Sequence, residues 1–214
     1  MSAKAVASPK AVAPAGKVAH VSASLASWSV HEPAIRTDVT ATAALTADGW
    51  WIVDPVPIRS ATLKRLLGDR MVIGILLTNE NHERSAHALA GSLRVQVHAH
   101  EATRGRMERE PDHFFRDGTT LRGGLRVVHL PGASKGESAF VDDGNRAILV
   151  GDSLINLKET GFTFLPDKYC ENPSQMKKSL GRLLDFEFSV LTFAHGPPLA
   201  SKAKQRLQEL LRTA

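Results

Sequence analysis

The sequence predicts a mixed α/β fold in which two β-sheets pack face to face and helices cover their outer sides. Short apolar or alternating runs, which are typical of strands, occur in both halves of the chain. Each strand-rich stretch gives way to an amphipathic, helix-like pattern. A four-layer α/β sandwich, with the order helix, sheet, sheet, helix, accommodates this sequence of elements.

The composition is typical of one soluble globular domain. A chain of 214 residues is long enough to bury a sizeable core. Its hydrophobic content of 43% and charged content of 23% are ordinary for such a domain. Cys170 is the single cysteine, so an internal disulfide and a four-cysteine zinc site are excluded. We therefore expect a reducing, cytoplasmic location.

The first 31 residues differ from the rest of the chain because they contain no Asp or Glu. Lys4, Lys10 and Lys17 lie there in a background rich in Ala, Val, Ser and Pro. We predict a flexible tail over residues 1–30 and a folded domain over residues 31–214. No run of about 18 apolar residues occurs, so we expect no membrane contact. No Arg-rich cluster alternates with aromatic residues, so we expect no nucleic-acid binding.

The first half of the domain begins with a predicted β-hairpin. Residues 37–45 alternate in polarity, and the turn dipeptide Asp48-Gly49 separates them from a strand over residues 50–53. A helix is predicted over residues 60–67, with Ser60 as its N-cap. The elements predicted next are an apolar strand over 72–77, a helix over 83–89, a strand over 93–98 and a helix over 101–110.

The second half is predicted to contain successive antiparallel strands followed by helices. The strands are expected at residues 119–121, 125–130, 138–141 and 147–150. An amphipathic helix over 174–184, a final strand over 190–193 and a closing helix over 201–211 complete the domain.

Four short segments, in this order, carry a resemblance to a known family. Residues 77–84 read Leu-Thr-Asn-Glu-Asn-His-Glu-Arg after a buried strand, and residues 130–138 form a Pro-Gly turn. Residues 149–152 end in Gly-Asp, and residues 193–198 contain Ala-His-Gly. Their order and spacing resemble the loop motifs of the metallo-β-lactamase superfamily. The resemblance implies a four-layer αββα sandwich of that type, over roughly residues 39–211.

The resemblance also implies two metal sites, of which the first is matched poorly. Its three histidines correspond to Asn79, Asn81 and Ala133. Neutral amide oxygens are poor substitutes for imidazole at zinc, and alanine offers no ligand atom. We therefore expect the first metal site to be lost.

The second site is matched by Glu83, Arg84, Asp152 and His195. A guanidinium has no free lone pair and repels a divalent cation. We predict that Arg84 replaces the metal by pairing with the carboxylates, and that no metal is bound. These four residues would be the catalytic set if the protein is an enzyme.

His82 leaves an alternative open. It could be a displaced ligand that joins Asp152 and His195 to hold one ion of zinc, iron or manganese. It could also be a histidine that only hydrogen-bonds within its loop. A divergent branch of the superfamily, with a Thr-Asn-x-His-His-type loop and a Pro-Gly turn lacking histidine, is similar to this chain, and residues 164–169 and 183–186 resemble that branch. Asn81 departs from its pattern.

Two functional hypotheses follow from the resemblance. The first is a metal-poor module with a degenerate site, which keeps the old cleft to bind an unknown small molecule or protein. The second is a residual hydrolase with one metal ion, acting on an ester, a thioester or a lactam-like substrate. A role in nucleic-acid processing would rest on fold analogy alone. The pattern leaves the oligomeric state open.

The remaining candidates are weaker. His98 and His100 share one face of a strand but lack a third ligand nearby, so we expect a packing role. Cys170 has no base beside it in the sequence. Ser134 and Ser138 lie outside any nucleophile motif, and the glycines before Lys135 have the wrong spacing for a phosphate loop.

Overall fold

The computed structural model describes residues 12–213, and its first sheet has seven strands whose spatial order follows the chain from β1 to β7. Its strands are β1 (Ala19–His20), β2 (Leu25–Glu32), β3 (Thr37–Thr46), β4 (Gly49–Val53), β5 (Val72–Leu76), β6 (Val97–His100) and β7 (His113–Phe115). Strands β1 to β4 pair antiparallel, whereas β4 to β7 pair parallel.

The second sheet has four strands in the order β13–β10–β9–β8. They are β8 (Arg126–His129), β9 (Ser138–Asp142), β10 (Ala147–Leu149) and β13 (Val190–Thr192); β11 (Leu154–Leu157) and β12 (Gly161–Phe164) form a separate pair. The helices are α1 (Ser60–Leu67), α2 (Ala86–Leu93), α3 (Pro173–Leu180) and α4 (Ala203–Arg212). Strand β13 runs parallel to β10, so these two strands end at the same edge.

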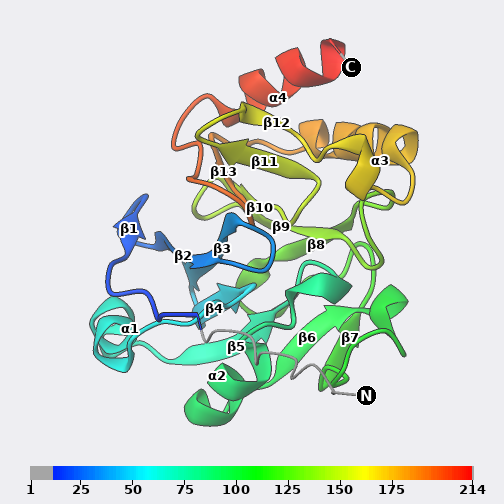
Figure 1. The fold of residues 1–214 in the computed structure, drawn as a ribbon. Coiled ribbons are helices and arrows are strands. Elements are labelled where there is room, and N and C mark those ends of the chain that lie inside the picture. The colour runs from blue at the N-terminus through cyan, green and yellow to red at the C-terminus, as the bar shows by residue number, and fades with distance from the viewer. Residues whose placement is uncertain (1–11, 214) are drawn as a thin grey trace, which may run out of the picture.

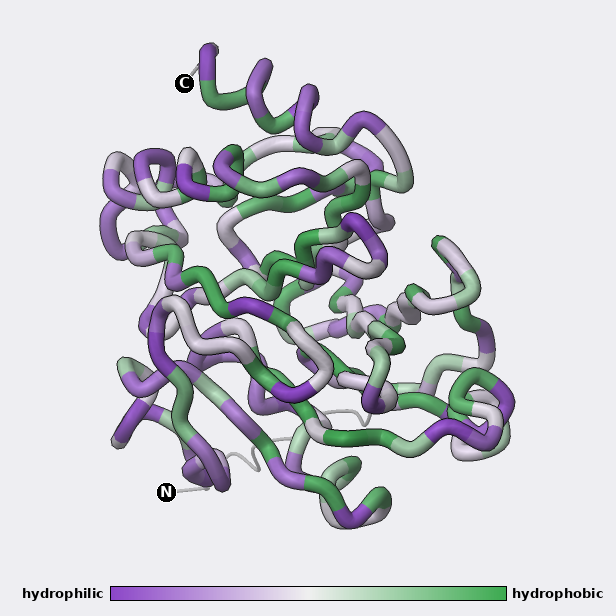
Figure 2. The backbone as a smooth tube through the Cα atoms, turned by 180° about the vertical axis from the view of Figure 1, so that it is seen from behind, coloured by the Kyte–Doolittle hydropathy of each residue, from purple (hydrophilic) through white to green (hydrophobic). Residues whose placement is uncertain are grey.

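The elements form four layers, which confirms the predicted αββα sandwich. Helices α1 and α2 pack on the outer face of the first sheet, and α3 and α4 pack on the outer face of the second (Figure 1). A third apolar cluster fills the space between the sheets, where Phe115 and Phe140 meet edge to face with ring centroids 5.6 Å apart. Figure 2 shows hydrophobic stretches along the inner strands and a more polar C-terminal helix.

The adjacent Trp50 and Trp51 of β4 illustrate how the alternation of a strand builds two layers. Trp50 faces α1 in the outer cluster, whereas Trp51 faces the second sheet. Trp51 packs so closely on Gly74 that a Cβ at Gly74 would lie 2.2 Å from the indole ring. Only glycine therefore fits at that position of β5.

The predicted N-terminal tail needs correction. Residues 1–11 lie outside the described part of the chain, but residues 25–32 form β2 and pair along their length with β3. Leu25, Ala26 and Trp28 are at most 2% exposed. The folded domain therefore begins before residue 31. The alternating serines within β2 obscured its strand pattern.

Several predicted element boundaries also differ from the structure. The helix predicted over 101–110 was wrong, because only a short 3-10 turn (Glu101–Thr103) forms there. Residues 119–121 form no strand of their own, and α2 starts three residues later than predicted. Arg59 rather than Ser60 is the N-cap of α1. Among residues 12–213, no helix is both long and apolar enough to cross a membrane.

Candidate metal centre

A cluster of polar side chains lies where the parallel strands of both sheets end. Asp54 follows β4, Thr78 and His82 follow β5, Asp152 follows β10, and His195 follows β13. The carboxyl ends of parallel strands meet at one edge, so the two sheets bring these loops together. His82, Asp152 and His195 each contribute one potential ligand atom, and these atoms lie within 4.8 Å of one another.

His82 is held in place by buried acceptors. It ends a 3-10 turn (Glu80–His82), which Asn79 caps by accepting a hydrogen bond from the Asn81 amide at 2.8 Å. The side chain of His82 is 1% exposed. Its Nδ1 lies 2.8 Å from Thr78 Oγ1 and 2.9 Å from Asp54 Oδ2. Thr78 Oγ1 donates its own proton to Asp54 Oδ2 at 2.6 Å, so both neighbours of Nδ1 act as acceptors.

His195 is oriented in a similar way by the main chain. Its Nδ1 donates to the carbonyl oxygen of Asp38 at 3.0 Å, because a carbonyl can only accept. The following Gly196 has a φ of 96° and packs against the backbone of Asn156, where a Cβ would lie 2.0 Å from the carbonyl oxygen. The Ala-His-Gly turn thus requires glycine, and it directs the opposite ring nitrogen, Nε2, towards Asp152.

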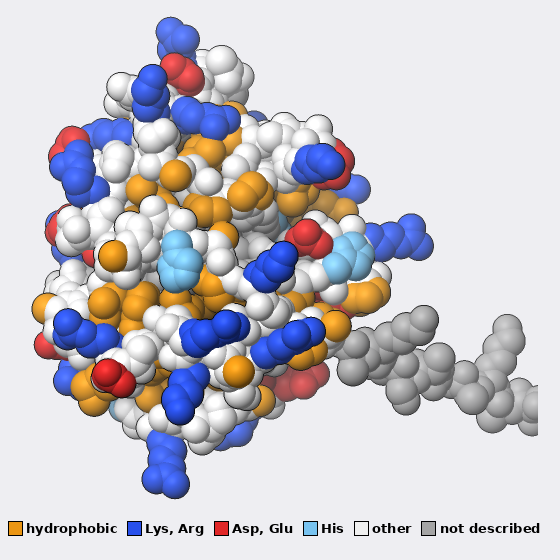
Figure 3. Space-filling model, turned by 90° about the vertical axis from the view of Figure 1, so that its left-hand side faces the viewer, with side chains coloured by type: hydrophobic (Ala, Val, Ile, Leu, Met, Phe, Trp, Pro, Cys, Tyr) orange, Lys and Arg blue, Asp and Glu red, His pale blue; other side chains and the backbone are white. Residues whose placement is uncertain are grey.

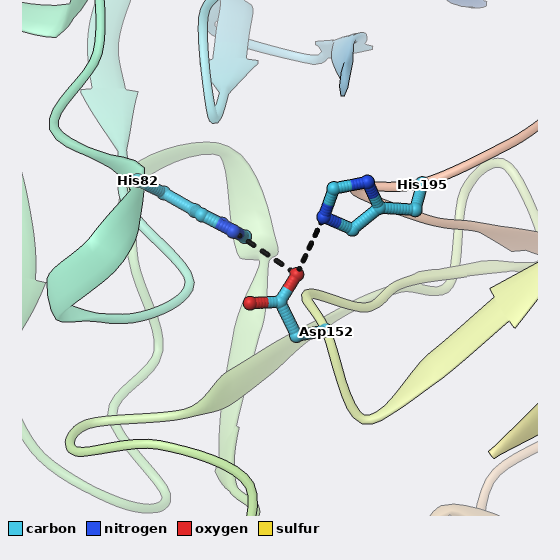
Figure 4. Close-up of side chains that lie close together, drawn as sticks. All are labelled: His82, Asp152 and His195. Atoms are coloured by element: carbon cyan, nitrogen blue, oxygen red, sulfur yellow. Dashed lines mark ion pairs between the residues drawn. The ribbon is translucent and has the colours of Figure 1, made fainter. Parts of the chain in front are cut away.

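Asp152 receives both imidazole rings on one oxygen. Its Oδ1 lies 3.1 Å from His82 Nε2 and 3.2 Å from His195 Nε2 (Figure 4). Neither contact has hydrogen-bond geometry, since Asp152 Oδ1 and His82 Nε2 are both buried without a hydrogen-bond partner among the described residues. The two ring nitrogens therefore face the same carboxylate oxygen without forming a hydrogen bond to it.

This convergence requires a positive charge. Each Nδ1 already carries a proton that an acceptor binds, so a neutral ring presents a lone pair at Nε2. Lone pairs facing a carboxylate repel it unless each Nε2 is protonated or one cation lies between them. Burial and the charge of Arg84 lower the pKa of His82, but the carboxylates of Asp152 and Asp54 outweigh them and raise it to about 9. Burial opposes ionisation of Asp152, but the charge of His82 holds the pKa of its carboxyl well below the usual range.

The chemistry of these donors fits a single divalent ion. Nitrogen and oxygen ligands at about 2.0–2.2 Å from zinc lie about 3–4 Å from each other, close to the two distances to Asp152 Oδ1. Asp54 and the Asp38 carbonyl on the outer nitrogens are the supporting acceptors that metal-bound histidines need. Three protein ligands leave room for water or substrate, as in catalytic zinc sites.

The residues at the first metal position do not fit a metal. Asn79 is fully buried, and its amide nitrogen donates to Glu137 Oε2 at 2.8 Å and to Asp152 Oδ2 at 3.2 Å. Its oxygen caps the 3-10 turn, so neither end is free to bind an ion. Ala133 is buried and offers no donor atom, and Asn81 is exposed. Asn79 therefore bridges the carboxylates of Glu137 and Asp152.

Glu137 was missed as a site residue in the sequence. It is fully buried next to Asp152, and its Oε1 accepts hydrogen bonds from the Ser153 amide and hydroxyl, each at 2.9 Å. Burial and the charge of Asp152 raise the pKa of Glu137 to about 7, although the Ser153 and Asn79 donors oppose this. The signal was a glutamate within the Pro-Gly turn. Asp54 was missed as well, although it directly follows a buried strand.

Glu83 and Arg84 are not ion-paired with Asp152, although Arg84 lies close enough for its charge to lower the pKa of His82. The Glu83 carboxylate accepts hydrogen bonds from the amides of Glu108 and Arg109, each at 3.0 Å, and so holds the loop before β7. Arg84 has a φ of 31° and forms no ion pair with any described residue. Its Nη1 is buried without a hydrogen-bond partner in the described chain. The expected ion pair between Arg84 and Asp152 is not formed, and the imidazole rings of His82 and His195 face Asp152 instead.

A cavity of about 680 Å³ opens beside the cluster. Asp152 and His195 line its floor, and Asn81 and Ser134 add neutral polar groups. The rest of the lining is largely apolar. It comes from residues 34–37, from Ile155 and Leu157 of β11, and from Leu165, Pro166 and Tyr169. The arrangement resembles a substrate pocket, which is typically apolar with a few convergent polar groups.

The weaker candidates lie elsewhere. His98 stacks on His113 with ring centroids 5.0 Å apart, and His100 stacks on His129 at 4.0 Å. Neither pair belongs to a group of three potential ligands among residues 12–213. Cys170 lies 3.6 Å from the sulfur of Met176, and burial raises the pKa of its thiol.

The stacked histidines predict a loss of stability in acid. Burial and the charge of His113 lower the pKa of His98 to about 4, and burial and His129 do the same for His100. The unfolded chain takes up these protons near pH ~6.5, so the free energy of unfolding falls as the pH drops from about 6.5 towards 4. Urea unfolding of His98→Gln should show a shallower fall, whereas His20→Gln, at an exposed position, should follow the parent. The same dependence of the free energy of unfolding on pH in all three proteins would contradict the prediction.

Comparison with known proteins agrees with the sequence motifs. Residues 18–214 match the family model of the metallo-β-lactamase superfamily. The chain therefore belongs to the metallo-β-lactamase superfamily, as its motifs predicted. A comparison with curated proteins gives no match.

Solved structures of the superfamily share the fold. The metallo-β-lactamase family protein TTHA1429 from Thermus thermophilus is 23% identical with a TM-score of 0.66, covering 91% of this chain and 80% of its own. The DIM-1 metallo-β-lactamase is 13% identical with a TM-score of 0.73, covering 95% and 99%. TTHA1623, solved in a di-iron-bound form, is 25% identical with a TM-score of 0.57, covering 75% and 88%.

Proposed function

We propose that this chain is a hydrolase that works with one divalent metal ion held by His82, Asp152 and His195. The observation that carries the proposal is the convergence of two histidine Nε2 atoms on Asp152 Oδ1 without hydrogen-bond geometry. TTHA1623 binds two iron ions, whereas the buried Asn79 bridge here supports a single ion.

The chain's own residues would position the substrate and exclude bulk water. A divalent ion at such a site polarises a carbonyl and makes water a better nucleophile at neutral pH. The Asn81 amide and the Ser134 hydroxyl line the cavity and can donate hydrogen bonds to a carbonyl oxygen. Asp54 and the Asp38 carbonyl keep the histidine rings in one orientation. The substrate class is an ester, a thioester or a lactam-like compound.

A second candidate function is a metal-free binding module. The pKa of about 9 for His82 means that a proton can supply the positive charge at neutral pH. In that state the cluster is an ion pair with Asp152, and the cavity binds a ligand without turnover. The two candidates differ in whether protons or a metal ion neutralise the same atoms.

Metal stoichiometry separates them. Full-length protein is purified without chelator, dialysed against zinc, iron(II) or manganese, and assayed by elemental analysis. We expect one ion per chain, lost in Asp152→Asn and in His195→Gln. Asp143→Asn is the matched control, because Asp143 is exposed and its one ion pair within residues 12–213 is with Arg126 on the surface. An ion content near zero in the parent protein, or an unchanged content in Asp152→Asn, would leave the metal-free candidate.

A further inference from the structure

Exposed apolar side chains gather at the cavity beside the cluster. Among the residues that the structure describes, three large hydrophobic side chains are exposed: Ile35 at 56%, Met71 at 59% and Tyr169 at 63%. Ile35 and Tyr169 line the same cavity, whereas Met71 does not. Large apolar groups left in water at one place mark a binding surface.

The apolar wall is built from segments far apart in the sequence. Ile35 lies in the turn between β2 and β3, and Tyr169 ends a 3-10 turn (Asp167–Tyr169). Ile155 and Leu157 of β11, together with Leu165, add further apolar surface to the same lining. At about 680 Å³ the cavity is within the range of about 300–1,000 Å³ that holds small molecules.

The charges around the cavity favour one kind of ligand. Among the described residues of the lining, Asp152 is the only acidic one, and two histidines already face it. Arg36 is an exposed lining residue and forms no ion pair with any residue from 12 to 213. The chain as a whole is also basic, with a formal net charge of +5, and basic side chains predominate over acidic ones on the one face drawn in Figure 3. A neutral or anionic ligand therefore fits better than a cationic one.

We infer that this cavity binds the apolar acyl group of the substrate, so that the preferred substrate is an ester or thioester of a medium-chain carboxylic acid. The hydrolysis in this inference rests on the proposed function, whereas the binding of the acyl group does not depend on it. Ile35 and Tyr169 contact the acyl chain from opposite sides, and the carbonyl carbon lies next to Asp152 and His195. Arg36 favours a free carboxylate product over an amine of the same length.

The test measures binding apart from turnover. Calorimetric titration of the full chain, with and without zinc, uses acetate, hexanoate, octanoate and octylamine as probes. We expect affinity to rise about two- to four-fold per added CH₂, and octanoate to bind more tightly than octylamine. Ile35→Ser and Tyr169→Ser should each weaken octanoate binding at least several-fold, while Met71→Ser, equally exposed but outside the cavity, should not. In parallel, hydrolysis of octanoyl and acetyl esters is compared in the parent and the same three variants.

Each outcome bears on one of the two proposals. Octanoate binding that depends on Ile35 and Tyr169, without hydrolysis or metal, would support the acyl site and refute the proposed reaction. Hydrolysis with no preference for octanoyl over acetyl esters, unchanged in both variants, would overturn the acyl site and leave the reaction standing. If a second copy of the chain covers these side chains instead, Ile35→Ser would shift a dimer to a monomer and leave octanoate affinity unchanged, which would also overturn it.

Discussion

Replacing Asp54 with alanine is expected to lower the free energy of unfolding by about 3–5 kcal/mol. The Asp54 side chain accepts hydrogen bonds from the Thr78 amide at 2.8 Å and the Thr78 hydroxyl at 2.6 Å. It also lies 2.9 Å from His82 Nδ1, and all three residues are nearly or fully buried. Alanine would leave these donors without an acceptor in a dry environment. Urea unfolding at neutral pH measures the loss.

Two comparisons separate the effect of breaking the buried hydrogen-bond network from the effect of removing a carboxylate. Asp143→Ala removes an exposed partner of Arg126 and should cost at most about 1 kcal/mol. In the metal-loaded protein, Asp54→Asn should weaken zinc binding about 10- to 100-fold, because the support of the His82 ring is altered. Equal stabilities for Asp54→Ala and Asp143→Ala would refute the role assigned to Asp54.

Asn79→Asp should have the second largest effect on the free energy of unfolding, and the size of that effect should depend on metal. A carboxylate at this position would face Glu137 and Asp152 at the distances of the present amide, 2.8 and 3.2 Å. One of the carboxyls would then stay protonated at neutral pH. A pKa raised by about 2–3 units corresponds to a destabilisation of about 3–4 kcal/mol. Added zinc should recover part of this loss, because a cation can neutralise the extra charge.

Asn172→Asp provides the matched control for this substitution. Asn172 is the N-cap of α3 and accepts a hydrogen bond from the Gln175 amide at 3.0 Å. A carboxylate is as good an N-cap as an amide and is favoured by the helix dipole. The urea midpoints of both variants, measured with and without zinc, test this prediction. If Asn79→Asp is as stable as Asn172→Asp without metal, the bridge between the carboxylates does not exist as described.

The loops of the site were predictable because glycines and apolar strands surround them. Gly151 precedes Asp152, and a Cβ there would lie 2.5 Å from Thr78 Oγ1, so the Gly-Asp motif reflects a close approach of two strand ends. The Ala-His-Gly motif at His195 has a similar origin in Gly196. Such steric requirements fix glycine at these positions, so they can be recognised in the sequence. The four layers were predictable from the alternating and apolar patterns of the strands.

Other parts of the site depend on the directions in which side chains point, and no local sequence pattern encodes these directions. The motif alignment placed Glu83 and Arg84 at the metal and left His82 as an alternative. In the structure, His82 faces Asp152, whereas Glu83 and Arg84 do not pair with it. The partnership of Asn79 with Glu137 spans 58 residues, and nothing near either residue indicates it. Strand β2 was missed because its small and polar residues carry little hydrophobic signal.

The order of the strands also determines when the cluster can form during folding. The first sheet follows the chain from β1 to β7, so each strand can pair with the one synthesised just before it. His195, in contrast, contacts the carbonyl of Asp38 across 157 residues and depends on β13 reaching β10. Contacts of such long separation form slowly because of the entropy of closing the intervening loop. We therefore expect the cluster of His82, Asp152 and His195 to be completed late in folding, after the sheets that support it.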